Sequence, residues 1–129
     1  MSNKPRIILL HHNLSCNVPI QDRIEFENLS TEVVSTLLMD EAFRAIPETG
    51  SCILITDSLI ASSDLPRNKK IVEDFIRDTK AKKPNCKTIL YAFDYLKLDT
   101  KLFDYAIPLG SGDDFELLFE KLKELSNQN

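Results

Sequence analysis

The chain has 129 residues, 43% of them hydrophobic and 28% charged, with a formal net charge of -4 at pH 7. This length is typical of one globular domain with a single core, so we predict one domain over residues 1–129. The acidic balance gives no overall attraction to nucleic acid or anionic membranes, and the apolar runs are too short for a signal peptide or a membrane span. Cys16, Cys52 and Cys86 have no paired spacing and indicate reduced thiols, so we expect a soluble, cytoplasmic protein.

The first two predicted elements are a buried strand and a short helix. Residues 7–10 form a continuous apolar run with β-branched side chains, which is typical of a strand covered on both faces. Asn17 can cap the helix that follows, and Pro19 suits its first turn. This helix would bury one apolar face, made of Ile20, Ile24 and Leu29.

Residues 30–38 fit either a strand or a helix, because their apolar residues also have helical spacing. The density of β-branched side chains favours a strand over residues 32–36. A second helix over residues 40–46 should follow and end at Pro47. Residues 52–56 are nearly all apolar and predict the third strand.

The second half of the chain continues this alternation. A long polar segment, residues 58–67, precedes a third helix, whose apolar face begins with residues 71–76 and which should end at Pro84. Two further strands are predicted over residues 88–93 and 105–107. The stretch between these two strands has room for only one or two helical turns.

The last helix has the clearest pattern in the sequence. Asp113 and Glu116 are spaced like a capping box, and an apolar stripe follows, made of Phe115, Leu118, Phe119, Leu122 and Leu125. Strands that alternate with helices predict a parallel sheet with helices on both faces. The fold class is therefore α/β, with a doubly wound sheet of five strands.

Polar side chains follow two of the predicted buried strands. His11 and His12 come directly after the first strand, and Asp57 comes directly after the third. In an open α/β sheet these strand ends meet at the edge where ligands bind. With this order and spacing, the chain resembles the receiver domain of bacterial response regulators over nearly its whole length. The segments that carry the resemblance are residues 6–13, 32–42, 52–57 and 104–109.

The resemblance implies a receiver or flavodoxin-like fold with strand order 2-1-3-4-5, here with a shortened fourth helix. It also implies that Asp57 stands at the phosphoacceptor position. Receivers use an acid pair and the acceptor to hold Mg²⁺, and a lysine to compensate the phosphoryl charge. In this chain His11 and His12 stand at the acid-pair positions, and Pro108 stands at the lysine position.

The small hydroxyl that receivers carry on the fourth strand falls on Tyr91 or Ala92, depending on register. Magnesium prefers oxygen ligands, and phosphoryl transfer depends mostly on electrostatic stabilisation. The resemblance therefore predicts a degenerate pseudo-receiver that is not an enzyme and uses no cofactor or metal. Its expected role is that of a protein-interaction module in signalling or regulation.

Two other functions are left open by the sequence. His11 and His12, with Cys16 or Asp57, offer ligands for zinc or copper, and Asp57 itself is a possible phosphorylation site. Adjacent strand residues, however, point to opposite faces, which argues against one ion bound by both histidines. Cys16 could serve a small flavodoxin-like enzyme as nucleophile, although Arg23 comes one residue too late for a phosphate-binding arginine.

Two surfaces are candidates for partner binding. Basic residues concentrate over residues 67–87, where a solvated helix face is the simpler interpretation because no aromatic side chains are interleaved for nucleic acid. Next to the shortened fourth helix, Tyr95, Phe103 and Tyr105 should be partly exposed and able to anchor an interface. We expect a protein partner, such as a regulator or kinase, or a second copy of the chain, and neither membrane nor nucleic acid.

Overall fold

The structure is a computed structural model that describes residues 4–11, 14–58, 69–92, 98–109 and 112–126, with the backbone alone for residues 14–16 and 69. Its elements, in chain order, are β1 (Arg6–Leu10), α1 (Leu14–Phe26), β2 (Glu32–Thr36), α2 (Met39–Ala45), β3 (Cys52–Thr56), α3 (Lys69–Lys82), β4 (Cys86–Ala92), the 3₁₀ helix η1 (Thr100–Leu102), β5 (Tyr105–Pro108) and α4 (Asp114–Ser126).

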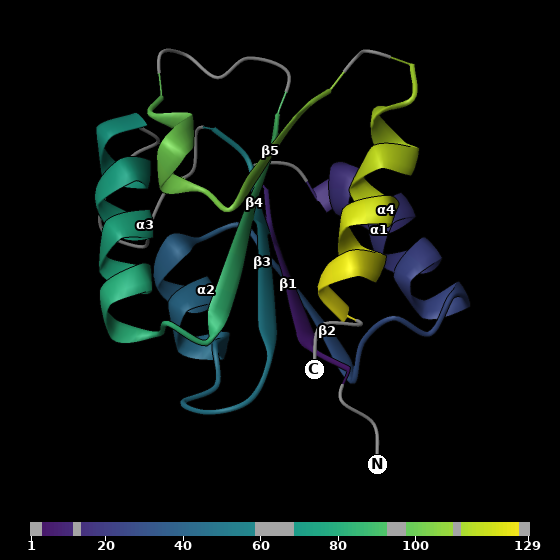
Figure 1. Cartoon of the computed structure of the whole chain (residues 1–129), viewed down its shortest axis with the longest axis horizontal. Coiled ribbons are helices and arrows are strands. Elements are labelled where there is room, and N and C mark those ends of the chain that lie inside the picture. The colour runs from purple at the N-terminus through teal and green to yellow at the C-terminus, as the bar shows by residue number, and fades with distance from the viewer. Residues whose placement is uncertain (1–3, 12–13, 59–68, 93–97, 110–111, 127–129) are drawn as a thin grey trace.

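The strands form one parallel sheet in the order β2-β1-β3-β4-β5, which confirms the predicted topology. Helices α1 and α4 cover one face, and α2, α3 and η1 cover the other (Figure 1). Leu10 of β1 lies opposite Thr36 of β2 and Thr56 of β3. The three strands therefore end at the same level, and the residues that follow them leave the sheet side by side.

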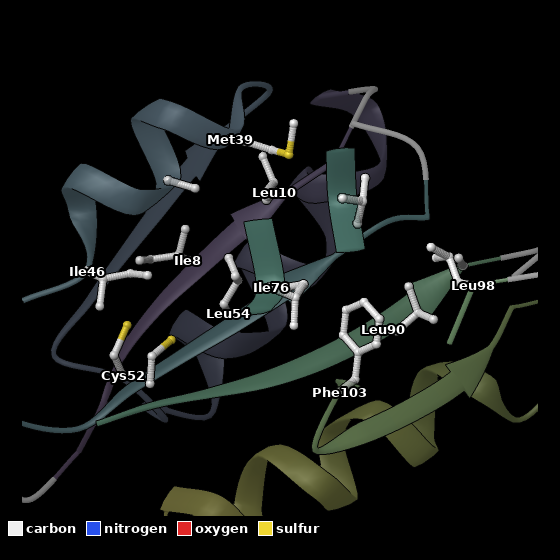
Figure 2. Close-up of a cluster of buried hydrophobic side chains, with 14 residues drawn as sticks. Ile8, Leu10, Met39, Ile46, Cys52, Leu54, Ile76, Leu90, Leu98 and Phe103 are labelled. Carbon is white, nitrogen blue, oxygen red and sulfur yellow. The ribbon is translucent and has the colours of Figure 1, made fainter. Parts of the chain in front are cut away.

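The apolar strands divide their side chains between two cores, because neighbouring residues in a strand point to opposite faces. Figure 2 shows the core under α2 and α3, in which Ile8, Leu54 and Leu90 lie among side chains from the helices. The opposite core lies under α1 and α4 and includes Ile7, Leu9, Ile20, Ile24, Ile53, Ile55, Ile89, Leu118, Phe119 and Leu122. Burial on both faces explains why these strands are apolar throughout.

Helix α1 begins earlier than predicted. It starts at Leu14, so Pro19 is its sixth residue, and the side chain of Asn17 donates to Ser35 Oγ (2.8 Å). The predicted start, with Asn17 as cap and Pro19 in the first turn, is wrong. The helix can include the proline because the ring removes only one of its earliest backbone hydrogen bonds, near the end where most N–H groups have no helical partner.

The end of α1 shows why Leu29 lies outside the helix. Asn28 adopts a left-handed conformation with φ of 56°. The N–H of Leu29 then donates to Ile24 O (3.1 Å), and the N–H of Asn28 donates to Glu25 O (3.2 Å). This is a Schellman C-cap, in which asparagine tolerates the left-handed position. Leu29 packs on the core from just beyond the helix.

The C-terminal ends of α2 and α3 are tied together by Lys83. Its buried Nζ donates to Ile46 O (2.8 Å) and lies 3.1 Å from Glu48 Oε1. Next to it, Asn85 Nδ2 donates to Pro47 O (3.0 Å). These bonds satisfy carbonyl groups at and beyond the end of α2 that have no partner within a helix.

The connection from β4 to β5 corrects one prediction. Its described part, residues 98–104, contains only the short helix η1. This agrees with the prediction that the helix between the fourth and fifth strands is shortened. Phe103, however, is only 5% exposed and belongs to the core under α2 and α3 (Figure 2). The prediction that it is partly exposed is wrong, because a short connection still has to cover the apolar sheet and Phe103 does so. Tyr95 lies outside the described residues.

No helix in the described ranges is both long and apolar enough to cross a membrane.

Candidate functional site

The carboxyl edge of the sheet brings His11 and Asp57 into contact. His11 Nε2 lies 3.3 Å from Asp57 Oδ2, and each side chain is 8% exposed. The backbone places both residues, because the N–H of His11 donates to Thr36 O (3.3 Å) and the N–H of Asp57 donates to Leu10 O (3.1 Å). Sheet hydrogen bonding thus continues one residue beyond the strands and fixes the two side chains next to each other.

The second oxygen of the Asp57 carboxylate is held by Ser58. Asp57 Oδ1 accepts the Ser58 N–H at 2.7 Å and lies 3.4 Å from Ser58 Oγ. Both carboxylate oxygens therefore have described partners, and Ser58 is itself buried. Ser58 was not among the predicted site residues. The sequence signal for Ser58 is that an aspartate side chain can accept the backbone N–H of the residue that follows it.

Side-chain hydrogen bonds join the end of β2 to α1 and α2. Thr36 Oγ1 donates to Glu41 Oε1 (2.6 Å) and accepts the Leu38 N–H (3.2 Å) at the start of α2. Asn17 of α1 reaches Ser35 of the same strand. None of these residues was predicted as part of the site. They tie the first turns of α1 and α2 to the strand that bonds the backbone of His11.

The other residues assigned to receiver positions have different surroundings. Tyr91 is buried in the core under α1 and α4, and Ala92, which carries no hydroxyl, pairs with Pro108 of β5. Pro108 is exposed and has no charge to offer. His12 and the side chain of Cys16 lie outside the described residues. Among the side chains that the structure describes, no group of three or more potential ligands could hold a metal ion.

The buried carboxylate of Asp57 is contacted by nitrogen atoms of His11 and Ser58 and by the Ser58 hydroxyl. Removing a carboxylate from water is costly unless hydrogen bonds or an opposite charge compensate it. The imidazole of His11 can provide both when it is protonated. Magnesium would instead require several oxygen ligands around Asp57. Among the described side chains, His11 contacts Asp57 Oδ2 through a nitrogen atom.

The predicted interface residues have different surroundings. Tyr105 is half-buried on β5, and the ammonium of Lys121 lies 4.9 Å from the centre of its ring. Phe103 is in the core, as described above. Tyr105 is therefore the described member of the predicted set that reaches the surface, and it does so next to α4.

The basic residues of α3 are largely paired with acids. Arg77 contacts Asp74 (3.4 Å), and Lys82 contacts Asp78 (3.2 Å) on the same helix. Lys80 reaches Asp104 (3.6 Å). This is the pattern of a solvated helix face, as predicted, and it leaves less free positive charge for a phosphate backbone than the sequence alone indicates.

Comparison with known proteins gives structural relatives only. No protein-family model matches the sequence, and no protein of curated function matches it. The response regulator TrrA of Thermotoga maritima, solved in complex with Mg²⁺ and BeF, has a TM-score of 0.68 at 18% identity, covering 94% of this chain and 98% of that chain.

Two isolated receiver domains are similarly close. The REC domain of RcsB from Salmonella enterica serovar Typhimurium, with the phosphomimetic BeF₃⁻, has a TM-score of 0.73 at 14% identity, covering 94% of this chain and 89% of that chain. The receiver domain of the sensor histidine kinase PA1611 from Pseudomonas aeruginosa, with a magnesium ion in its active-site cleft, has a TM-score of 0.69 at 11% identity, covering 97% and 99%.

The structure is therefore a doubly wound α/β domain whose polar residues gather at the carboxyl edge of a parallel sheet. More particularly, its fold is that of the receiver domains of response regulators.

Proposed function

We propose that this protein is a receiver-like signalling or regulatory module that acts by binding other proteins and does not catalyse its own phosphorylation. The receiver fold supports a role in signalling. The observation that carries the proposal is the contact of His11 with Asp57 at 3.3 Å. At this position a receiver needs acidic oxygen ligands for Mg²⁺, and here an imidazole contacts the carboxylate instead.

The lysine position supports the same conclusion. Pro108 ends β5 without a charged side chain, so it cannot compensate a phosphoryl group on Asp57. Phosphoryl transfer is accelerated almost entirely by positioning and by electrostatic stabilisation. A site that lacks both the acid at position 11 and the lysine at position 108 has lost the main contributions to that stabilisation.

Intact-mass spectrometry tests the proposal directly. The protein is incubated with acetyl phosphate and Mg²⁺, beside a receiver with a complete acid pair and lysine as positive control. We expect the control to gain the mass of a phosphoryl group and this protein to remain unmodified. Stoichiometric modification that disappears in Asp57→Asn would overturn the proposal and favour a phosphorylatable response regulator.

The kind of partner and its binding surface also belong to the proposal. We expect a protein, either another regulator or kinase or a second copy of this chain, to bind at the β5 edge around Tyr105, whose ring is half-buried beside Lys121. Aromatic side chains of this kind often anchor interfaces.

A further inference from the structure

A groove runs between α2 and α3 on the face of the sheet opposite α1 and α4. Its volume is about 630 Å³. Residues from one side of α2 and one side of α3 line it: Met39, Asp40, Phe43, Arg44, Ile71, Asp74, Phe75 and Asp78. On each helix the lining residues recur at intervals of three or four positions, so each wall is a continuous helical stripe.

The floor of the groove is apolar and contains two aromatic rings. Ile71 and Phe75 are half-buried and pack on the core while offering surface to a ligand. Phe43 is also half-buried, and the Lys83 ammonium lies 5.0 Å from the centre of its ring. Met39 belongs to the core itself, where it lies close to Leu10 (Figure 2). An open apolar strip with aromatic anchors fits the apolar side chains of another helix, as in helix-in-groove recognition.

The charged residues of the groove favour a partner helix with basic side chains. Its charged lining residues are three aspartates and one arginine, which gives a formal charge of -2. Asp74 and Asp78 stand one turn apart on the α3 wall, and their side chains are 61% and 50% exposed. Asp74 and Asp78 contact Arg77 (3.4 Å) and Lys82 (3.2 Å), which do not line the groove, and Asp40 contacts the lining Arg44 (3.7 Å), so a basic helix has to compete with these surface pairs. Exposed pairs of this type contribute little and exchange partners readily.

We propose that this groove binds a short amphipathic helix of a partner protein, with an apolar stripe along the floor and lysine or arginine side chains against Asp74 and Asp78. The α3 wall from Ile71 to Asp78 spans about 10 Å at 1.5 Å per residue, so roughly two turns of the partner make contact. This surface is separate from Tyr105, and the inference rests on the proposed function as a protein-binding module.

The groove is also connected to the site at the carboxyl edge. The first turn of α2, which provides Met39 and Asp40, is held to β2 by the bonds of Thr36 to Glu41 and to the Leu38 N–H. Thr36 in turn accepts the backbone N–H of His11. One wall of the groove is therefore positioned by the same strand end that positions His11.

Fluorescence anisotropy with designed peptides tests the inference on the full chain. The probe is a labelled peptide of about 14 residues, roughly four turns, with leucines at helical positions i, i+3, i+4 and i+7 and lysines flanking this stripe. A matched peptide has glutamate in place of every lysine. We expect the basic peptide to bind with a dissociation constant in the micromolar range and the acidic peptide to bind at least about tenfold more weakly.

Two charge-reversal variants locate the binding. Asp74→Lys with Asp78→Lys should weaken binding of the basic peptide by at least about tenfold, since it reverses both carboxylates of the α3 wall. The control is Glu120→Lys with Glu124→Lys, which has the same spacing on the exposed side of α4, and it should leave the affinity unchanged. Circular dichroism melting verifies that both double variants are folded.

Several outcomes would overturn the inference. They are failure of the basic peptide to bind, equal binding of both peptides, equal effects of the two double variants, and amide chemical-shift changes centred on Tyr105 rather than on Phe43 and Phe75. A concentration-dependent dimer that Asp74→Lys with Asp78→Lys abolishes would assign the groove to a second copy instead. Phosphorylation of Asp57 is detected by intact mass and peptide binding by anisotropy on the unmodified chain, so a failure of the proposed function and a failure of this inference are distinguishable.

Discussion

His11 and Asp57 form a buried contact across neighbouring strand ends, with Nε2 and Oδ2 3.3 Å apart. His11 directly follows β1, the first strand in the chain, and Asp57 directly follows β3. Their proximity results from the parallel register that makes these strands end level. The contact gives the carboxylate a nitrogen partner that the protein itself supplies, in place of a metal ion from solution.

Replacing His11 should destabilise the fold through Asp57. In His11→Ala the imidazole that contacts the buried carboxylate is lost, so we expect the free energy of unfolding at pH 7 to fall by about 3 kcal/mol. Urea denaturation measures this change. Adding Asp57→Asn should recover part of the loss, because a neutral amide can still accept the Ser58 N–H. A loss below about 1 kcal/mol, or no recovery in the double variant, would show that the pair contributes little.

Alkaline pH should weaken the fold through Cys86. Contact with the Cys52 thiol and burial raise the pKa of the Cys86 thiol far above its ordinary value of 9.0. Above this pH the unfolded thiol ionises while the folded thiol stays protonated, so the unfolded state is favoured. The contribution of this thiol to the free energy of unfolding is fully present below about pH 9. Above that pH it should fall by up to about 1.4 kcal/mol per pH unit.

The matched variant for this prediction is Cys86→Ala, which removes the titrating thiol. Urea denaturation between neutral and alkaline pH should show a less steep loss of stability in the variant than in the natural chain. Other groups titrate in the same range, so the difference between the two slopes is the quantity that matters. Identical slopes would mean that the folded thiol ionises as readily as the unfolded one.

Removing the Tyr105 ring should affect association more than folding. Tyr105→Ala should weaken binding to a partner at the β5 edge by about 1–2 kcal/mol or more, because half-buried aromatic residues often carry interface energy. Isothermal titration with the partner, or sedimentation if the partner is a second copy, measures the change. An unchanged affinity with an intact circular dichroism spectrum would place that interface elsewhere.

Lys83 should stabilise the fold where Lys82 does not. Lys83→Met keeps the apolar stem but removes the charged donor to Ile46 O, so we expect a loss of about 2 kcal/mol in the free energy of unfolding. Lys82→Met is the control, because Lys82 pairs with Asp78 on the surface and such pairs are worth about 0–1 kcal/mol. Equal effects in urea denaturation would contradict the role given to Lys83.

The sequence predicts the strand order and the meeting of His11 with Asp57, because both depend on regular features. Apolar runs of strand length identify the buried strands, and parallel strands joined by helices align their carboxyl ends. The contacts of Ser58, Thr36 and Glu41 depend on side-chain conformations in short turns, which periodicity does not encode. The start of α1 could not be placed either, since the helix includes a proline that the general rule puts in the first turn.

Phe103 shows a different limit of the sequence. A shortened helix next to β5 predicts that Phe103 is partly exposed. In the structure Phe103 itself covers the sheet, together with Leu98 from the same connection. The groove between α2 and α3 could not be foreseen at all, because its width depends on how far apart the two helices sit, and hydrophobic patterns give only which side of each helix faces inward.

The bond from Lys83 to Ile46 has a consequence for the speed of recognition. Because it fastens the far ends of α2 and α3 to each other, the two helices should move as a single body and the space between them should exist before any ligand arrives. A partner helix would then find a ready cleft, and its association would be limited by encounter and orientation instead of by opening of the domain. Loosening this connection with Lys83→Met would convert a rigid receptor into one that must first be ordered, and the cost would appear as a slower association rate.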